Sequence, residues 1–522
     1  MSKSPVLLHI AALARAGAAD HAWEVFQASG LAASAAPADL SLKGRLLKEL
    51  GRRAEGDERR NFYHRSAEAY RLAAQRGGGA YPLINAATLS LLAGDETSAR
   101  LHALAALAAP EEQHETPYYQ VATRAEALLV LRRSPEARDA LAQAVSLAPE
   151  AWEDHAITLR QFALVLETLG EDAEWLNVFR PPRTLHFAGL IGLSPHDEAL
   201  VQAVARVVAE EKVGFGYGAL AAGADIVIAE ALAAAGAELH VVLPVDPVAF
   251  RARSVQPYGE AWASRFDALM KTVGDRVSVV APGCGPADPA ALRLAAETAM
   301  GLAVMKAAAL ATEPLQLLIL EGGDLATAPP GLSVQAGKLW AACHRRQRSL
   351  SASRVSTVGG RMHAGATTRL AAFLCVEFEI DIGASDPDGL LRHVAGLLPE
   401  DAARLAPPVW LGRTLWLAYG DLEAASRASR AILSAGGDGV RLAGHYGLAV
   451  ATRNPFGPGA ILLGPEVERA RSILPSVPPG AMHGSLCFAA ALVASGAAVS
   501  TERVGDLTSA DGAMGLYALG FS

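Results

Sequence analysis

The sequence predicts a multidomain protein in which an all-α segment, an α/β segment and an α+β segment follow one another. A chain of 522 residues is too long for one compact core at roughly 150 residues per domain. Helical periodicity fills the first third, strands and helices then alternate one for one, and this strict alternation is lost in the last third. The expected domains are 1–180, 184–346 and 368–522.

The composition excludes several classes of protein. Hydrophobic residues make up 51% of the chain and charged residues 19%, so it is expected to fold throughout. The 46 basic and 54 acidic residues give a net charge of −8, which provides no general attraction to nucleic acid or anionic membranes. Charges interrupt each alanine-rich run, so we expect no membrane span. Four widely separated cysteines indicate neither a disulfide framework nor a zinc site, which favours a cytoplasmic protein.

Helical hairpins account for the first segment. Between residues 125 and 149 two apolar stripes at helical spacing flank a turn, and Ser134 is expected to cap the second helix with Pro135 in its first position. Similar pairs of helices are expected at 89–108 and 162–179. Repeated hairpins predict a solenoid, because each buries its stripe against the next. An ordinary helical bundle is the alternative.

Two stretches of this segment resemble known repeats. Ala127–Pro149, with its Ser-Pro-Glu-Ala-Arg turn, resembles a tetratricopeptide repeat (TPR). Tyr81–Leu89, followed by Leu91–Asp95, resembles the repeat-containing TRAF-binding region of apoptosis-signalling protein kinases and its bacterial relatives. The resemblance implies that the helical repeats contact a protein partner.

Alternating strands and helices predict a Rossmann-like parallel sheet in the second segment. Strands are expected at 184–190, 213–216, 238–243, 276–280 and 316–320, and helices at 196–211, 225–235, 260–273, 289–310 and 334–346. The polar, basic stretch 345–354 is expected to lead into the third segment. There we expect helices at 388–398, 421–433 and 466–473 and a pair of strands at 440–451.

Glycine-rich turns mark the candidate ligand site of this sheet. Ligands of open parallel sheets lie beyond the carboxyl ends of the strands, where glycines let backbone N–H groups approach an anion. The candidate nucleotide-binding residues are Gly214, Gly216, Gly218, Gly223, Asp225, Glu230, Gly322 and Gly323. Because GxGxxG is absent, a dinucleotide dehydrogenase is disfavoured. Alternatively, the glycines serve only turns and packing, and Glu230 is a solvated or capping residue. Asp246 and Arg251–Arg253 either line the same pocket or belong to a solvated loop.

The run Gly223–Ala231, followed by Glu238–Pro244, resembles the SLOG superfamily of sensor domains that bind nucleotide derivatives. The resemblance covers about residues 184–345. It implies a nucleotide-like small molecule as ligand, although the superfamily includes enzymes as well as sensors.

Ordered blocks of the third segment resemble class III adenylate and guanylate cyclases. They are Ala372–Glu377, Leu415–Asp421, Val440–Gly447, Gly464–Arg471 and Pro478–Ser485. The resemblance implies a ferredoxin-like α+β domain that forms a homodimer. It also implies that Glu377 and Asp421 occupy the positions of the two aspartates that hold two Mg²⁺ or Mn²⁺ ions in those enzymes.

Other positions of the cyclase pattern are altered. The places of the asparagine and arginine that orient the ribose and stabilise the phosphate hold Glu468 and Ser472. Arg471 could substitute if the helix were rotated. A slip of the first strand, along which Glu377, Glu379 and Asp381 alternate, could bring Asp381 to the metal site. No confident catalytic residue results, and a degenerate module for dimerisation or ligand sensing is expected. His445 and His483 are assigned packing or surface roles.

Three hypotheses of function follow. The preferred one is a cytosolic signalling or scaffold protein with protein-binding repeats, a nucleotide-derivative-sensing domain and an inactive cyclase-like dimerisation domain. The alternative is a divergent nucleotidyl cyclase that makes a cyclic nucleotide from ATP or GTP with divalent metals at Glu377 and Asp421. The third is a nucleotide-processing activity of the middle domain, such as base release. No cofactor is certain. A nucleotide-derived ligand is one candidate, and Mg²⁺ or Mn²⁺ is expected only if the cyclase is active.

Overall fold

A computed structural model describes most of the chain as two compact units. The described residues are 5–15, 19–110, 115–285, 288–356, 368–379, 386–398, 403–455, 457, 459–509 and 512–521. One unit comprises Met1–Pro181 with Ala309–Ala311, and the other comprises Pro182–Ala308 with Thr312–Ser522. The second unit therefore contains both the expected α/β segment and the expected α+β segment. Asp381 lies outside the described residues.

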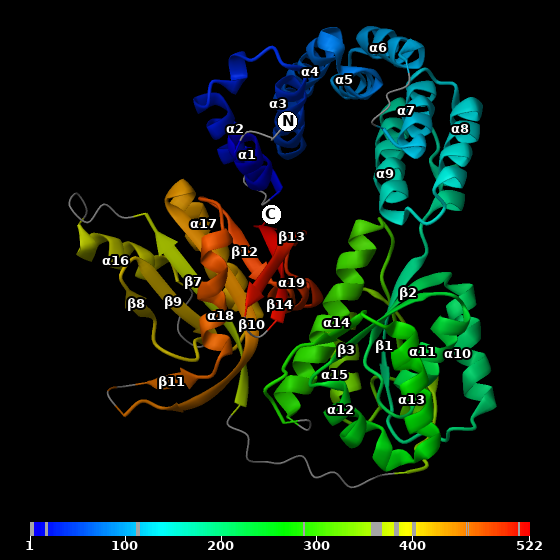
Figure 1. Ribbon diagram of the computed structural model, residues 1–522, viewed down its shortest axis with the longest axis vertical. Coiled ribbons are helices and arrows are strands. Elements are labelled where there is room, and N and C mark those ends of the chain that lie inside the picture. The colour runs from blue at the N-terminus through cyan, green and yellow to red at the C-terminus, as the bar shows by residue number, and fades with distance from the viewer. Residues whose placement is uncertain are drawn as a thin grey trace. The chain divides into compact units, whose positions relative to one another are not determined.

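The described part of the first unit is helical, as expected (Figure 1). Neighbouring helices α3 and α4, α5 and α6, and α7 and α8 pack in pairs, and buried alanine and leucine side chains join successive pairs. The helices are α1 (Pro5–Arg15), α2 (Ala19–Ala28), α3 (Pro37–Arg53), α4 (Gly56–Ala73), α5 (Ala80–Leu92), α6 (Glu96–Ala108), α7 (Pro117–Val130), α8 (Ser134–Leu147) and α9 (Trp152–Leu169).

One predicted helix cap of this unit is wrong. Ser134 does not cap α8, because the helix already begins at Ser134 and Arg133 occupies the cap position. The Ser134 hydroxyl instead donates to Glu171 Oε2 at 2.7 Å, across to the end of α9. By contrast, the Asp95 side chain caps the N-terminus of α6 by accepting a hydrogen bond from the Ser98 N–H at 2.9 Å.

A six-stranded parallel sheet forms the first part of the second unit, with the strand order β4-β3-β2-β1-β5-β6. Its strands are β1 (Arg183–Gly189), β2 (Val213–Gly218), β3 (Glu238–Leu243), β4 (Val277–Val279), β5 (Leu315–Leu320) and β6 (Arg346–Ser351). The accompanying helices are α10 (Glu198–Glu210), α11 (Ala224–Ala234), α12 (Pro247–Ser254), α13 (Glu260–Val273), α14 (Pro289–Ala309) and α15 (Leu332–Ala342).

The basic stretch that was expected to be a linker is partly a strand. Residues Arg346–Ser351 form β6, which pairs with β5 and extends the parallel sheet beyond residue 346. Arg346 and Arg348 donate to the buried Glu211 carboxylate at 2.8 and 3.2 Å. Because β6 is an edge strand with polar side chains on both faces, it lacks the apolar alternation by which a strand is predicted.

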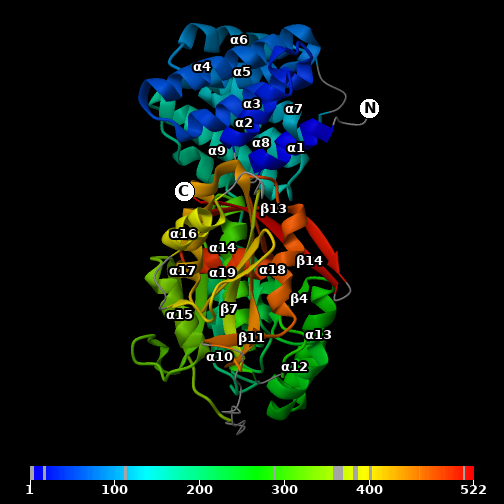
Figure 2. The ribbon, with the colours of Figure 1, turned by 90° about the vertical axis from the view of Figure 1, so that its left-hand side faces the viewer.

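An eight-stranded mixed sheet forms the second part, with the strand order β13-β14-β12-β10-β7-β9-β8 and β11 paired to β10. Its strands are β7 (Thr368–Phe378), β8 (Val409–Leu411), β9 (Thr414–Tyr419), β10 (Val440–Arg453), β11 (Ala460–Leu463), β12 (Met482–Ser485), β13 (Val499–Ser509) and β14 (Gly512–Phe521). Its helices are α16 (Pro387–Leu397), α17 (Leu422–Gly436), α18 (Glu466–Ile473) and α19 (Leu486–Ala494). The strand pair expected at 440–451 is the single strand β10, and β13 and β14 form a long antiparallel hairpin (Figure 2).

Helix α14 belongs to the cores of both sheets. Ala295 and Ala299 pack with Val242 of the parallel sheet, whereas Leu294 is buried among side chains of the mixed sheet. On the mixed-sheet side, the buried Glu297 carboxylate accepts a hydrogen bond from the Tyr446 hydroxyl at 2.9 Å. The two sheets therefore share buried side chains along this helix.

Candidate functional site

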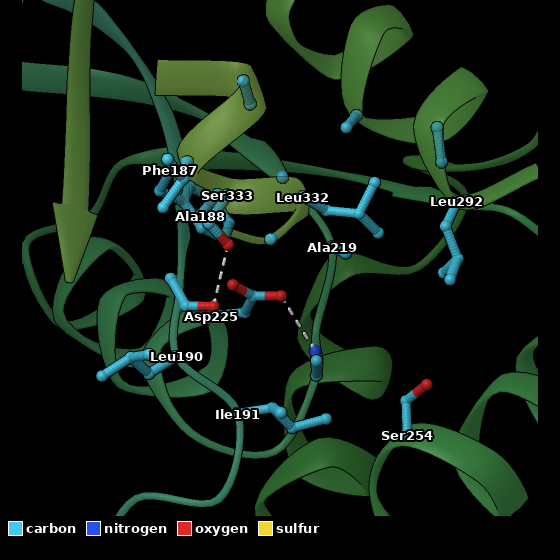
Figure 3. A pocket seen from close by; sticks show the side chains of 18 of the residues that line it. Phe187, Ala188, Leu190, Ile191, Ala219, Asp225, Ser254, Leu292, Leu332 and Ser333 are labelled. Atoms are coloured by element: carbon cyan, nitrogen blue, oxygen red, sulfur yellow. Dashed lines mark hydrogen bonds between the residues drawn. The ribbon is translucent and has the colours of Figure 1, made fainter. Parts of the chain in front are cut away.

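A cavity of about 340 Å³ opens at the carboxyl ends of β1 and β5 (Figure 3). Strands β1 to β4 follow one another toward one edge of the sheet, whereas β5 lies on the other side of β1. The order of the strands thus reverses between β1 and β5, which is where open parallel sheets bind ligands. Ala188 and Leu190 line the cavity from β1 and the turn after it, and Leu320 and Glu321 line it from β5 and its turn.

Asp225, in the first turn of α11, presents a carboxylate to this cavity (Figure 3). The Ala221 N–H donates to its Oδ2 at 3.1 Å. Burial raises the pKa of Asp225 from 3.8 to about 7, although the backbone hydrogen bonds from Ala221 and Gly189 act in the opposite direction. Asp225 can therefore donate or accept a proton near neutral pH.

Groups that favour a negatively charged ligand line the cavity at the start of α15, in contrast to the Asp225 carboxylate. Gly331, Leu332 and Ser333 line the cavity at the N-terminus of this helix, where backbone N–H groups lack helical partners and favour an anion. Arg354 also lines the cavity and adds a positive charge. Apolar side chains make up much of the remaining wall, among them Phe250 and Leu292. The arrangement suits a ligand with an apolar ring, hydroxyl groups and an anionic group.

The first glycines predicted to cradle a phosphate lie inside strand β2 and not in a loop beyond it. A Cβ atom on Gly214 would meet Pro182 Cγ at 2.4 Å, one on Gly216 would meet Leu232 Cδ1 at 2.4 Å, and one on Gly218 would meet Phe187 Cε2 at 2.5 Å. These glycines permit close packing, which was the alternative interpretation. Of the three, Gly218 also lines the cavity.

Gly223 positions the start of α11. Its φ of 132° is one that side chains rarely adopt, and a Cβ atom would lie 2.4 Å from the Leu190 carbonyl oxygen. The next residue, Ala224, donates its N–H to the same carbonyl at 2.9 Å. This close approach of two turns places Asp225 at the cavity, so Gly223 acts on the site through the backbone.

The other predicted residues of this domain are not among those that line the cavity. Gly322 and Gly323 form a short turn after β5 with φ of 74° and 75°, and the neighbouring Glu321 lines the cavity in their place. Glu230 forms an ion pair with Arg265, whose Nε and Nη2 lie 2.8 and 2.5 Å from its two oxygens. Five residues along α11 from Asp225, Glu230 faces α13, because an α-helix turns 100° per residue.

The segment after β3 was assigned to the pocket or to a solvated loop, and it is the helix α12. Asp246 caps this helix by accepting hydrogen bonds from the N–H groups of Val248 and Ala249. Arg251 donates to both oxygens of Asp267 at 2.9 and 3.0 Å. The cavity is lined instead by Phe250 and Ser254 of the same helix.

In the mixed sheet, Glu377 lies near the end of β7 beside two guanidinium groups. Arg413 Nη2 is 3.3 Å from Glu377 Oε1, and Arg441 Nη1 is 3.5 Å from Oε2. These side chains and Glu379 line a small cavity of about 70 Å³. Arg413 belongs to the tight turn between β8 and β9, so this hairpin brings a positive charge to the acidic end of β7.

Asp421 does not share a site with Glu377. Glu377 pairs with Thr414 at one end of β9, whereas Asp421 follows Tyr419 at the other end, so the whole length of β9, about 17 Å from Thr414 to Tyr419, lies between them. Asp421 caps α17 by accepting the N–H groups of Glu423 and Ala424. The predicted metal pair is therefore not formed. Among the residues that the structure describes, no group of three or more His, Cys, Asp or Glu side chains could hold a metal ion.

The helix that was compared with the phosphate-binding helix of cyclases is α18, with the bounds predicted for it. Glu468 and Arg471 are exposed and lie 3.7 Å apart as an ion pair. The Ser472 hydroxyl donates to the carbonyl of Arg469 on its own helix at 2.8 Å. None of the three is among the residues that line the small cavity beside Glu377.

Both histidines assigned to packing are buried. His445 Nδ1 lies 2.8 Å from Ser485 Oγ, and its Nε2 lies 2.6 Å from Glu466 Oε2. His483 Nδ1 lies 3.2 Å from Ser476 Oγ, and burial lowers the pKa of His483 to about 4. Ser485 is itself almost fully buried, whereas Glu466 is partly exposed.

Sequence reasoning missed several residues around the two cavities. His186, Ser333 and Arg354 line the larger cavity although none belongs to a glycine-rich turn. The Pro-Pro-Gly sequence just before α15 was a usable signal of a helix start at a strand end. Likewise, Gly412-Arg413 between two short strands was a usable signal of the hairpin turn that brings Arg413 to Glu377.

The helical segment matches a protein family described as Tetratricopeptide Repeats-Sensor over residues 6–90. The match confirms TPR-like repeats over residues 6–90, which is less than half of the chain, and it does not cover the stretch Ala127–Pro149. It does not test the resemblance to a TRAF-binding region, which stays a prediction. No curated protein matches the chain.

Solved structures of nucleotidyl cyclases are similar to part of the chain. The guanylate cyclase domain of RhGC from Catenaria anguillulae, in complex with GTP, is 12% identical and covers 28% of this chain and 94% of its own, with a TM-score of 0.24. A dimeric guanylyl cyclase domain from Blastocladiella emersonii is 14% identical and covers 29% of this chain and 97% of its own, with a TM-score of 0.24. The adenylyl cyclase CyaB from P. aeruginosa is 12% identical and covers 30% of this chain and 96% of its own, with a TM-score of 0.23. These values carry no inference about activity.

None of the helices in the described ranges combines the length and the apolar character needed to cross a membrane.

Proposed function

We propose that the protein is a signalling protein whose parallel sheet binds a nucleotide-derived ligand, and that its mixed sheet is a cyclase-like module without cyclase activity. The observation that supports it most strongly is the cavity of about 340 Å³ where the strand order reverses between β1 and β5. The helical repeats then bind a protein partner, and the mixed sheet mediates self-association.

The chemistry of the cavity wall supports a nucleotide-like ligand. The Asp225 carboxylate can accept hydrogen bonds from ribose hydroxyls or a base amine. The start of α15 and Arg354 can receive a phosphate. Apolar side chains such as Phe250 and Leu292 provide the surface that an aromatic base needs.

The proposal that the mixed sheet is inactive rests on the surroundings of Glu377. Ring closure with two metals needs carboxylates that share the ions, and Asp421 lies at the far end of β9. Two guanidinium groups already neutralise Glu377, and a third cation placed there would meet their repulsion. Purified protein incubated with ATP or GTP and Mn²⁺ is expected to give no cyclic nucleotide. Product that disappears in Glu377→Ala would establish the alternative, a divergent cyclase.

Ligand binding is tested with a matched pair of variants on α11. Small molecules released from the purified full chain by denaturation are identified by mass spectrometry, and AMP, ADP, ATP and GTP are titrated calorimetrically. We expect a nucleotide derivative that the wild type and Glu230→Gln retain and that Asp225→Asn binds about tenfold or more weakly. The control is suitable because Glu230 pairs with Arg265 outside the cavity. A wild-type protein that releases no nucleotide derivative and binds none of the four at about 1 mM would contradict the proposal.

A further inference from the structure

His186 lines the same cavity from the middle of β1 and takes no part in the proposal above. Its imidazole is buried and stacks on Trp340, with ring centroids 5.9 Å apart. It is the last member of a row of three polar side chains that crosses three neighbouring strands. In the register of the sheet, His186 of β1 pairs with Gln316 of β5, and Gln316 pairs with Gln347 of β6.

A backbone carbonyl fixes the direction of every hydrogen bond in this row. Gln347 Nε2 lies 3.1 Å from the Gly337 carbonyl oxygen, which can only accept, so the amide group at this position is the NH₂. The same NH₂ donates to Gln316 Oε1 at 2.6 Å. The other end of Gln316 is therefore its NH₂, which donates to His186 Nδ1 at 2.9 Å.

The proton of His186 is placed by this row. Because Nδ1 accepts a hydrogen bond, the neutral imidazole carries its hydrogen on Nε2. Burial lowers the pKa of His186 to about 3, so the ring is neutral at physiological pH. The two glutamines thus fix one tautomer of a buried histidine.

His186 is one of the residues that line the cavity, and no hydrogen bond of its Nε2–H group to another described residue is present. Nε2 is not among the fully buried nitrogen and oxygen atoms without partners, although His186 as a whole is only 1% exposed. A hydrogen-bond donor fixed on Nε2 therefore belongs to a residue of the cavity wall.

We propose that His186 is a specificity-determining residue of the cavity, where its Nε2–H donates a hydrogen bond to an acceptor atom of the ligand. This inference rests on the proposed nucleotide-binding function and adds to it the chemistry of one contact. The ligand must place an unprotonated ring nitrogen or a carbonyl, hydroxyl or phosphate oxygen at His186. A ligand with an ammonium or N–H group at that place is rejected, since two donors would face each other.

The tautomer is measured without any ligand. Long-range ¹H–¹⁵N spectra of the full chain with labelled histidine are compared with those of His186→Asn to assign the ring. We expect a protonated Nε2 and an unprotonated Nδ1 that persist to about pH 4, because burial opposes the charged form. A ring protonated on Nδ1 would overturn the proposal.

The role in binding is measured with AMP as the probe and Gln316→Glu as the variant. A carboxylate at position 316 accepts from Nδ1–H, so Nε2 loses its hydrogen and becomes an acceptor. We expect the dissociation constant for AMP to rise about tenfold or more, with the tautomer reversed in the spectra. His240→Gln, on β3 and outside the cavity lining, is the control and is expected to bind as the wild type does.

The outcomes separate the two proposals. Equal affinity of wild type and Gln316→Glu for AMP, with the tautomer reversed, overturns the role of His186 and leaves the nucleotide-binding function standing. A wild type that binds none of the tested nucleotides contradicts both. If Gln316→Glu does not fold, or if the spectra show that His186 keeps its hydrogen on Nε2 in this variant, AMP binding to His186→Asn decides. Unchanged affinity in His186→Asn then overturns the proposal.

Discussion

The two sheets of the second unit each place an acidic side chain near a strand end, but the surroundings of the two carboxylates differ. Asp225 of the parallel sheet is buried at a cavity and receives backbone N–H groups, whereas Glu377 of the mixed sheet lies between Arg413 and Arg441. An acidic residue in a recognisable pattern is therefore a candidate site only where its oxygens remain available to a ligand. By this criterion the parallel sheet holds the better candidate.

The largest expected effect that tests this difference is the pH dependence of stability at Asp225. Its pKa is about 7 in the folded chain against an ordinary 3.8, so the folded state holds a proton that the unfolded state has lost between these values. The unfavourable contribution is absent below pH 3.8, grows as the pH rises and is complete above about 7, where it reaches about 4 kcal/mol. Urea unfolding of wild type and Asp225→Asn from pH 4 to pH 7 measures it.

The variant is expected to gain stability relative to the wild type as the pH rises. Glu230→Gln removes an acidic group of the same helix outside the cavity and serves as the control. A difference between wild type and Asp225→Asn that stays constant over this range would show that burial does not raise the pKa of Asp225.

A second, smaller effect tests the packing of α14, which belongs to the cores of both sheets, against α19 of the mixed sheet. A Cβ atom on Gly301 of α14 would lie 2.0 Å from the Ala490 carbonyl oxygen of α19. Gly301→Ala should therefore lower the free energy of unfolding by about 1–3 kcal/mol. Urea denaturation followed by tryptophan fluorescence and circular dichroism checks the loss.

The matched substitution is Gly396→Ala in α16, where no atom lies within 4 Å of the new methyl group. It is expected to raise the free energy of unfolding by about 0.5–1 kcal/mol, because alanine is the better helix former. Equal effects of the two substitutions would argue that α14 and α19 are not packed together.

The smallest effect is expected at Arg413. Its side chain is 54% exposed, and an ion pair at such a site contributes less than about 1 kcal/mol. Arg413→Ala should therefore change the unfolding midpoint in urea only slightly, as should Arg427→Ala at the exposed pair with Glu423. A loss several times larger for Arg413 would show that Glu377 depends on its partner as a buried carboxylate does, which would remove the contrast with Asp225.

Periodicity determined much of the fold in advance. The order of helical, parallel-sheet and mixed segments follows from spacings of 3.6 and 2 residues and from the alternation of elements, which are local properties. The bounds of α18 were predicted to the residue, because Gly464-Pro465 is a local signal for the start of a helix and Pro475 is a local signal for its end. The placement of Asp225 at the start of a helix after β2 was also available from the Gly-Ala-Asp sequence.

The roles of individual residues depended on neighbours distant in the sequence. The spacing of three glycines, Gly214, Gly216 and Gly218, is typical of a loop that binds phosphate. In the fold, side chains packed against β2 leave no room for a Cβ atom at these positions, so the glycines serve packing. Glu377 and Asp421 are 44 positions apart in the numbering, and only the register of β7 with β9 places them at opposite ends of a strand pair.

The sequence by itself determined which segments form helices and strands and which residues could titrate or carry charge, because backbone preferences and hydrophobic spacing act over a few residues. The tertiary structure alone decided which of those groups meet. The row from Gln347 through Gln316 to His186 exists only because three strands separated by 130 and 31 positions lie in register, and that register fixes the proton on His186.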